Sequence, residues 1–258
     1  MGKCIKGLLF LLLLVLISPA DSLATQWSIR GGAGFDWSTD ANFHDEDCSS
    51  KNPAALFGCG PGIDGRSLGA YGDFGDFAVF EVAAGLHLLD WLRTDVSVMF
   101  SPEIKYTGEA NFLNVPGEQP VSADAYAWSG MVNLFLNIAD LLHLNMGIFA
   151  PYVGGGAGLS YNHIGRITYR FPGLTKHKIS ITPSGSNTGF AYTLAAGTGI
   201  QLSKKILLDV SYRYSDLGKV ETDRGNMYMD SLQEGIEIAS TSAPLRTHGV
   251  ILGLRYLF

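Results

Sequence analysis

The feature of this sequence that most constrains its fold is the rhythm of the connections between eight alternating segments. In each segment apolar residues alternate with small or polar ones, as in a β-strand whose two faces meet different surroundings. We expect strands at Gln26–Trp37, Phe77–Leu88, Leu92–Glu103, Asp124–Ile138, Gly147–Asn162, Thr188–Leu202, Ile206–Ser215 and His248–Phe258. The connections are long, short, long, short, long, short and long. This order predicts an all-β fold, an eight-stranded antiparallel up-and-down transmembrane β-barrel with short periplasmic turns and long extracellular loops.

The last segment indicates which face meets which surroundings. Its apolar face carries Val250, Leu252, Leu254, Tyr256 and Phe258, and its other face carries Gly249, Ile251, Gly253, Arg255 and Leu257. An apolar face that ends in aromatic residues suits lipid and the lipid–water interface, and a face of small and charged residues suits a narrow lumen. A secreted β-sandwich or a lipocalin-like barrel is the alternative. It would place the apolar face inside and would leave the aromatic residues at the strand ends unexplained.

The N-terminus has the pattern of an export signal. Two lysines lie within the first six residues, and a continuous apolar run, Leu8–Ile17, follows them. Together with the small residues up to Ala24, this predicts a Sec-type signal peptide. A spanning helix would need about 20 consecutive apolar residues, and this run is shorter. We expect cleavage after Ala24, or alternatively after Ala20. Residues 1–24 are then the signal peptide and residues 25–258 the barrel domain.

The net charge and the cysteine content indicate which partners and which cellular compartment suit the chain. The formal net charge is −6, which argues against nucleic acid as a partner. Cys48 and Cys59 are the two cysteines beyond the signal peptide, and both lie in the first long connection. Because an exported chain meets an oxidising compartment, we expect a disulfide between them. The acidic residues nearby lack the spacing of a calcium-binding loop, and we expect no metal or cofactor.

The inward faces carry ionisable residues. By this register they are Arg30, Asp36, Glu81, His87, Arg93, Asp95, Asp209, Arg213 and Arg255. An unpaired buried ion costs several kcal/mol, so these charges should pair, and an eight-stranded barrel is only about wide enough for side chains to fill. We interpret them as a salt-bridged plug with Arg30, Glu81, Asp209 and Arg213 at its centre. The alternative is a small or gated pore.

The third long connection is locally basic in an acidic protein. Its residues Arg166, Arg170, Lys176 and Lys178 could pair with lipopolysaccharide phosphates at the outer rim. Small membrane barrels can also be lipid-modifying enzymes. The histidines of this chain do not reproduce the His-x-Ser-Asn pattern of lipid A deacylases, and we expect no enzymatic activity.

Four stretches carry a resemblance to a known family. They are Pro151–Tyr161, Phe190–Ile200, Leu208–Leu217 and Leu254–Phe258. In these stretches the chain resembles the OmpA-like and opacity-type family of eight-stranded outer-membrane barrels. The resemblance implies a bacterial outer-membrane location and a structural or surface-interaction role, through envelope integrity, adhesion or host contact. It also implies that Tyr256 and Phe258 form an assembly signal.

The resemblance implies a set of partners as well. These are outer-membrane lipid and lipopolysaccharide, the outer-membrane assembly machinery, and a host or surface ligand, with the protein as a monomer. A narrow channel for small solutes is the alternative function, and a lipid-modifying outer-membrane enzyme is a remote one.

Overall fold

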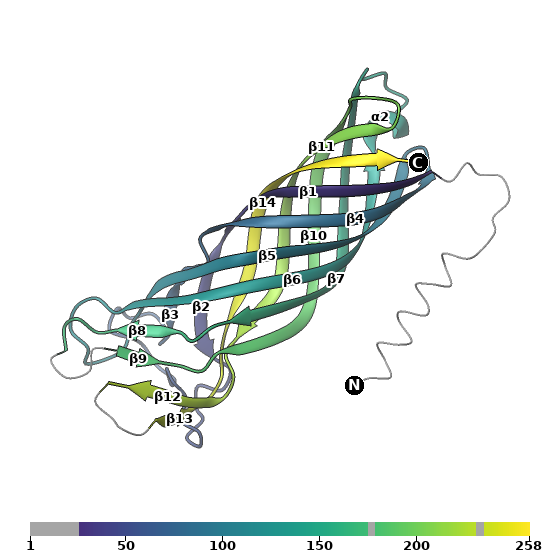
Figure 1. Cartoon of the computed structure of the whole chain (residues 1–258). Coiled ribbons are helices and arrows are strands. Elements are labelled where there is room, and N and C mark those ends of the chain that lie inside the picture. Colours follow the sequence, from purple (N-terminus) through teal and green to yellow (C-terminus); the bar gives the residue numbers. More distant parts are fainter. Residues whose placement is uncertain (1–25, 175–178, 231–234) are drawn as a thin grey trace, which may run out of the picture.

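The computed structural model describes residues 26–174, 179–230 and 235–258. Eight long strands form the barrel: β1 (Trp27–Ser38), β4 (Asp76–Leu89), β5 (Leu92–Ala110), β6 (Pro120–Asn137), β7 (Phe149–Ile164), β10 (Gly185–Gln201), β11 (Ile206–Glu221) and β14 (Thr241–Leu257). Each pairs antiparallel with the next, and β1 pairs with β14 to close the ring (Figure 1). The predicted eight-stranded antiparallel barrel is confirmed. The predicted signal peptide lies outside the described residues.

The short connections gather at one end of the barrel, which also holds the start of β1 and the end of the chain (Figure 1). Between β6 and β7 the chain forms a single helical turn, α2 (Ile138–Leu141). The Asn137 side chain caps this turn by accepting a hydrogen bond of 3.1 Å from the Ala139 amide. In the described parts of the chain, no helix has both the length and the apolar character needed to cross a membrane.

The first long connection contains two strands that the sequence analysis did not predict. β2 (Asp40–Asp45) follows β1 after a break at Thr39 and pairs with β14, and β3 (Ala70–Asp73) precedes β4 and pairs with β2 and β5. β1 with β2, and β3 with β4, are therefore two long strands, each interrupted once. No strand is expected here from the sequence, because each added strand is too short to show sustained alternation. Gly75, with φ of +61°, forms part of the second break.

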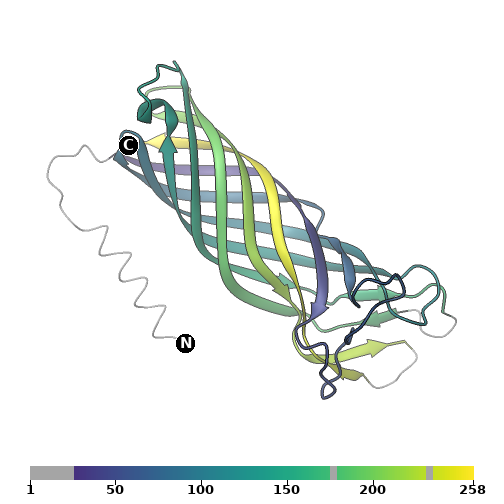
Figure 2. The ribbon, with the colours of Figure 1, turned by 180° about the vertical axis from the view of Figure 1, so that it is seen from behind.

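The third and fourth long connections also contain strands. They are β8 (Thr168–Arg170), β9 (Ile179–Ile181), β12 (Gly225–Met229) and β13 (Ile236–Ile238). β8 pairs with the beginning of β6, and the sheet continues through β9 and β12 to β13. Figure 2 shows these strands projecting beyond the barrel at the end opposite the short turns. The long loops are thus largely an ordered extension of the barrel sheet.

The polarity of the outward-facing and inward-facing side chains reverses partway along the long strands. On β5, Val96 and Val98 face outward and are exposed. A bulge follows between Ser101 and Ile104. Beyond it the outward residues are polar, as at Lys105, and the inward residues Ile104 and Tyr106 are completely buried. The same sheet therefore has an apolar outside at one end and an apolar inside at the other.

The long strands β14 and β6 show the same reversal. On β14, Leu252 faces outward in the apolar zone, whereas beyond the reversal Arg246 faces outward and Leu245 is buried. On β6 the outward residue changes from the apolar Leu134 to the charged Asp124. A band of exposed apolar side chains is stable when lipid surrounds it, and a polar outer face over an apolar interior is stable in water. The reversal therefore marks the membrane surface at the end of the long connections, which is the extracellular surface.

Aromatic side chains lie on the outer surface at this level. The Trp37 ring stacks on the His248 ring at 6.2 Å, and the Tyr212 hydroxyl lies 2.7 Å from Nδ1 of His248. Rings with a polar group suit the interface between lipid and water. At the other end of the apolar zone, Trp27 and Tyr256 are exposed on the outer surface. Two aromatic girdles therefore bound the membrane-spanning part of the barrel.

The extracellular half of the barrel contains a hydrophobic core. At its centre the Tyr106 ring packs edge-on against Phe43 and Phe74, with ring centroids 4.9 and 5.3 Å apart. The Tyr106 hydroxyl donates a hydrogen bond of 2.9 Å to the carbonyl of Ala70. Burying a phenylalanine contributes about 1.5–3 kcal/mol, so this core stabilises the barrel above the membrane as it would in a soluble protein.

Candidate functional site

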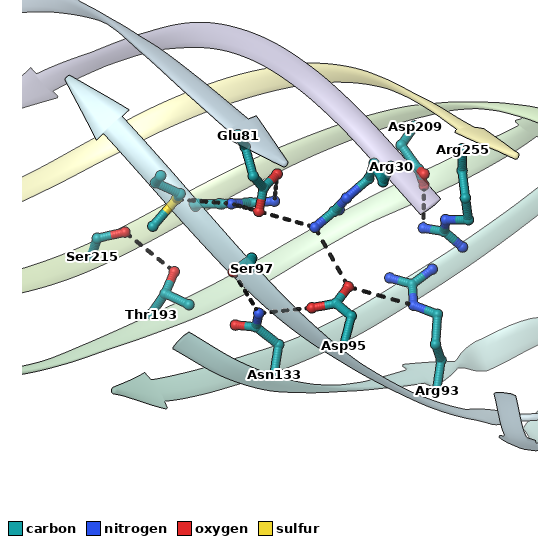
Figure 3. A network of polar contacts seen from close by, with 12 residues as sticks. Arg30, Glu81, Arg93, Asp95, Ser97, Asn133, Thr193, Asp209, Ser215 and Arg255 are labelled. Atoms are coloured by element: carbon teal, nitrogen blue, oxygen red, sulfur yellow. Dashed lines mark hydrogen bonds and ion pairs between the residues drawn. The ribbon is translucent and has the colours of Figure 1, made fainter. Parts of the chain in front are cut away.

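A buried ion-pair cluster crosses the lumen within the membrane-spanning half (Figure 3). The alternation of β1, β4 and β11 points Arg30, Glu81 and Arg213 inward. Arg213 donates two hydrogen bonds of 2.8 Å to the two carboxylate oxygens of Glu81. Arg30 donates a third, of 3.0 Å, to Oε1 of the same carboxylate. One glutamate thus receives three charge-assisted hydrogen bonds from two arginines, the geometry that compensates a buried carboxylate best.

The cluster continues through Asp95 towards the periplasmic end. The Asp95 carboxylate lies 3.5 Å from Nη2 of Arg30 and accepts a hydrogen bond of 2.7 Å from the Asn133 amide. Asn133 also donates to the Ser97 hydroxyl at 2.9 Å. Neutral polar groups therefore add hydrogen bonds to Asp95 in this buried network.

One part of the predicted plug differs from expectation. Asp209 does not join Glu81 at the centre; it accepts a hydrogen bond of 2.7 Å from Arg255. Asp209 lies four residues before Arg213 on β11, which is about 13 Å along a strand. That distance puts Asp209 nearer the periplasmic mouth, beside Arg255 of β14. Its pairing depends on the stagger of the strands, which alternation alone does not reveal.

Three further ionisable residues from the sequence analysis lie around this cluster. The Arg93 guanidinium lies 4.4 Å from the centre of the Phe135 ring, and its Nε is 4.0 Å from the Asp95 carboxylate. Asp36, near the extracellular end of the charged section, accepts a hydrogen bond of 3.1 Å from Thr247. His87 lies at the periplasmic mouth.

The lumen is packed through most of its length. A cavity between Asp36, Met99 and Leu217 measures about 10 Å³, roughly the space of a single water molecule. Above it lies the hydrophobic core, and below it lies the ion-pair cluster. A second cavity, of about 70 Å³, opens at the periplasmic mouth. In the described part of the chain, side chains thus separate the two ends of the barrel.

A cap formed by the first long connection closes the extracellular end. Cys48 and Cys59 form a disulfide, and Phe57 between them is buried in the core. The Asp45 carboxylate anchors the cap by accepting a hydrogen bond of 2.6 Å from the Phe57 amide. Burial raises the pKa of Asp45.

The same end carries a salt bridge on its outer surface. Lys219 donates a hydrogen bond of 2.7 Å to Glu46. This contact holds the pKa of Glu46 below its ordinary value.

An apolar pocket of about 360 Å³, which the sequence analysis missed, lies beside the cap. It is lined by Leu56, Phe112, Leu113, Val115, Tyr169, Phe171, Leu174, Ser180, Met227 and Met229. These residues come from all four long connections, so no local pattern groups them. An alternation as short as that of Tyr169 and Phe171 does not indicate a shared pocket.

The predicted surface sites are only partly described. Arg166 and Arg170 are exposed, and Arg170 donates a hydrogen bond of 3.0 Å to the Ser122 hydroxyl on β6. Lys176 and Lys178 lie outside the described residues. At the periplasmic rim, Tyr256 and Phe258 point outward with their ring centroids 5.1 Å apart.

Comparisons with known proteins agree with this architecture. A family model described as the outer membrane protein beta-barrel domain matches residues 7–258. A proposed adhesin of Rickettsia conorii is 23% identical over an alignment of 189 residues that covers 68% of this chain and 66% of that protein. The chain therefore spans just under two thirds of this relative. The outer membrane protein OprG of Pseudomonas aeruginosa has a similar fold, with a TM-score of 0.52 and 14% identity over 91% of this chain and 96% of OprG.

Proposed function

Because the chain belongs to the outer membrane protein beta-barrel domain family, we propose that it is a surface-interaction protein whose extracellular half binds a ligand on a host cell or another surface. It is an integral protein of the bacterial outer membrane, and its extracellular half is the part that a foreign surface can reach. In this proposal the barrel is a rigid anchor with no catalytic role.

The observation that carries this proposal is the contrast between the two halves of the barrel. The membrane-spanning lumen is filled by the Arg30–Glu81–Arg213 cluster, which leaves little room for a solute. Above the membrane the chain forms a hydrophobic core, a disulfide-linked cap and a sheet extension. An ordered platform with its own core supports binding, because a preorganised surface loses little conformational entropy when it meets a partner.

The sheet extension is the part of the platform that we assign to the contact. Its strands β8, β9, β12 and β13 project beyond the barrel, as Figure 2 shows. The relative from Rickettsia conorii, a proposed adhesin, supports the same class of function. Loops held by a rigid scaffold commonly carry the binding residues of a protein.

The proposal is tested with bacteria that display the protein. Cells expressing the wild type should adhere to cultured host cells or to immobilised extracellular matrix more strongly than cells carrying an empty vector. Replacing residues 225–238, which include β12 and β13, by a short Gly-Ser linker should abolish the gain. The matched control replaces the periplasmic turn residues Ser203 and Lys204 by Gly-Ser, and adhesion should be unchanged.

Conductance in a planar bilayer separates this function from a narrow channel. The wild-type protein should show no single-channel steps above the baseline. Steps that increase in Glu81→Ala would contradict the proposal, because they would show that the ion-pair cluster gates a pore.

We also propose that Arg166 and Arg170, which lie just before and within the sheet extension, contact lipopolysaccharide. Arg166 and Arg170 are both exposed, and guanidinium groups bind phosphates through paired N–H donors. Changing both to glutamate should weaken binding to purified lipopolysaccharide, measured by co-sedimentation. Equal binding of the wild type and this variant would exclude the contact.

A further inference from the structure

The periplasmic mouth of the lumen holds two of the four arginines that face inward in the charged section. The charged section contains four arginines (Arg30, Arg93, Arg213 and Arg255) and three carboxylates within 4.0 Å of them (Glu81, Asp95 and Asp209). The fourth inward acid, Asp36, binds Thr247 towards the extracellular end, and in the described residues it forms no ion pair with these arginines. At the periplasmic end Asp209 pairs with Arg255 and Asp90 lines the cavity, whereas Arg93 has only the more distant Asp95.

Arg93 is the arginine whose charge is least compensated. Its side chain is 7% exposed, and its closest carboxylate, Asp95, is 4.0 Å away, beyond hydrogen-bond distance. Within the described residues, Nε and Nη2 of Arg93 are buried without a hydrogen-bond partner. Its close neighbours are the rings of Phe135 and Tyr152, with centroids at 4.4 and 5.3 Å. These rings stabilise the cation through their faces but do not satisfy its N–H groups in the way that oxygen atoms would.

A second unpartnered donor lies in the same place. The Tyr152 hydroxyl is buried, and in the described chain it has no hydrogen-bond partner. Arg93, Tyr152 and Arg255 all line the cavity of about 70 Å³ at the periplasmic mouth, together with His87 and the acidic Asp90. Figure 3 shows Arg93 and Arg255 at the same end of the polar network. Two guanidinium groups and a hydroxyl donor thus surround one small space.

The size of the cavity indicates the size of its ligand. A water-sized group occupies about 10–15 Å³ on this measure, so the cavity holds about five such groups. Phosphate and sulfate each have five heavy atoms and oxygens on every side. A guanidinium presents parallel N–H donors that match two of these oxygens, and the surrounding aromatic rings limit access of water and so strengthen the attraction.

We propose that the periplasmic mouth of the barrel binds one small oxyanion of the phosphate or sulfate type between Arg93 and Arg255, with the Tyr152 hydroxyl as a further donor. The ion accepts hydrogen bonds from the donors of Arg93 and Tyr152 that have no partner among the described residues, and it completes the packing of the lumen. This site lies at the opposite end of the barrel from the surface proposed to bind ligands. The experiment on this site and the experiment on the proposed function can therefore fail independently of each other.

The test uses the intact protein extracted from the outer membrane in detergent. Isothermal titration with inorganic phosphate, at an ionic strength held constant with chloride, should show saturable binding of one ion per chain. The midpoint of thermal unfolding should rise with phosphate. Arg93→Gln should weaken the binding at least tenfold, and Tyr152→Phe should weaken it severalfold. The matched control is Arg224→Gln, which removes an exposed arginine at the extracellular end and should leave binding unchanged.

Tyr152→Phe keeps the ring beneath the Arg93 guanidinium, so it remains informative if Arg93→Gln fails to fold. An absence of saturable phosphate binding in the wild type would overturn the proposal, and so would binding that Tyr152→Phe leaves unchanged. A parallel titration with glycerol 3-phosphate distinguishes two sources of the ion. Binding of phosphate alone identifies a free ion, and equal binding of both identifies the terminal phosphate of a larger molecule.

Discussion

Arg213 and Glu81 face each other across the lumen through two parallel hydrogen bonds of 2.8 Å, although 132 residues separate them in the chain. They belong to β11 and β4, which are not neighbouring strands, so the pair spans the interior. Both side chains are almost completely buried. The contact therefore joins opposite walls of the barrel at the level where the lumen would otherwise be open.

Replacing Glu81 by glutamine should destabilise the barrel strongly. The change removes the one charge that Arg30 and Arg213 share, and breaking a buried ion pair costs about 3–5 kcal/mol. Urea unfolding in lipid vesicles measures the free energy of unfolding. Adding Arg213→Met should recover part of the loss, because Arg213 loses its carboxylate partner, whereas Arg30 keeps Asp95 at 3.5 Å. The control is Glu237→Gln, which breaks the exposed pair with Arg224 and should cost less than about 1 kcal/mol.

The reversal of the side-chain pattern predicts that an arginine on the outer surface destabilises the barrel on one side of the reversal and has little effect on the other. Leu134→Arg places a charge in the lipid zone of β6 and should cost about 2–4 kcal/mol. Thr107→Arg, on the outer face of β5 beyond the reversal, should stay within about 0.5 kcal/mol of the wild type. Unfolding experiments in the same vesicles compare the two. A similar loss in both variants would show that the membrane extends past the reversal.

Removing the disulfide should loosen the cap without unfolding the barrel. The double change Cys48→Ser and Cys59→Ser opens a loop of sequence separation 11, worth about 2–3 kcal/mol. Limited proteolysis should then cut the cap around Phe57, while the eight long strands stay protected. Cleavage inside the barrel strands would contradict this expectation. The wild type treated with a reductant provides an independent check of the same bond.

Acidification should release the contact between Glu46 and Lys219. The hydrogen bond from Lys219 lowers the pKa of Glu46, so its stabilising effect is present above the ordinary glutamate pKa and is lost as the pH falls through the lowered value. The pKa of the neighbouring Asp45 is shifted in the opposite direction. Burial raises its pKa, so acidification favours the folded cap at that residue. Hydrogen-exchange protection of the cap amides, after correction for the intrinsic dependence of exchange on pH, should fall more on acidification in the wild type than in Glu46→Gln.

Removing the terminal phenylalanine should impair assembly more than stability. Phe258 is exposed at the periplasmic rim, and its amide donates a hydrogen bond of 3.0 Å to the Trp27 carbonyl. Few contacts within the barrel depend on its ring, so an assembly factor could bind it. A chain ending at Leu257 should reach the outer membrane at a reduced level in cells. When refolded in detergent it should unfold at nearly the same urea concentration as the wild type.

The sequence by itself determined the strands of the membrane-spanning half and the direction of their side chains. Alternation is a local property, and lipid on one side and a narrow lumen on the other impose it on every strand. For this reason Val250, Leu252 and Leu254 could be assigned to the lipid face, and Arg30, Glu81 and Arg213 to the lumen. The same pattern could not show which charges meet. The stagger of the strands in the closed barrel determines that Glu81 contacts Arg213 and that Asp209 contacts Arg255.

Only the tertiary structure decided the organisation above the membrane. The short strands β2, β3, β8, β9, β12 and β13 carry too few residues to show a period, and their ends are stabilised by partners far away in the chain. Tyr106 and Phe43 become core residues because the sheet continues past the lipid surface into water. There the same barrel buries its apolar side chains inside, because water has replaced lipid as its surroundings.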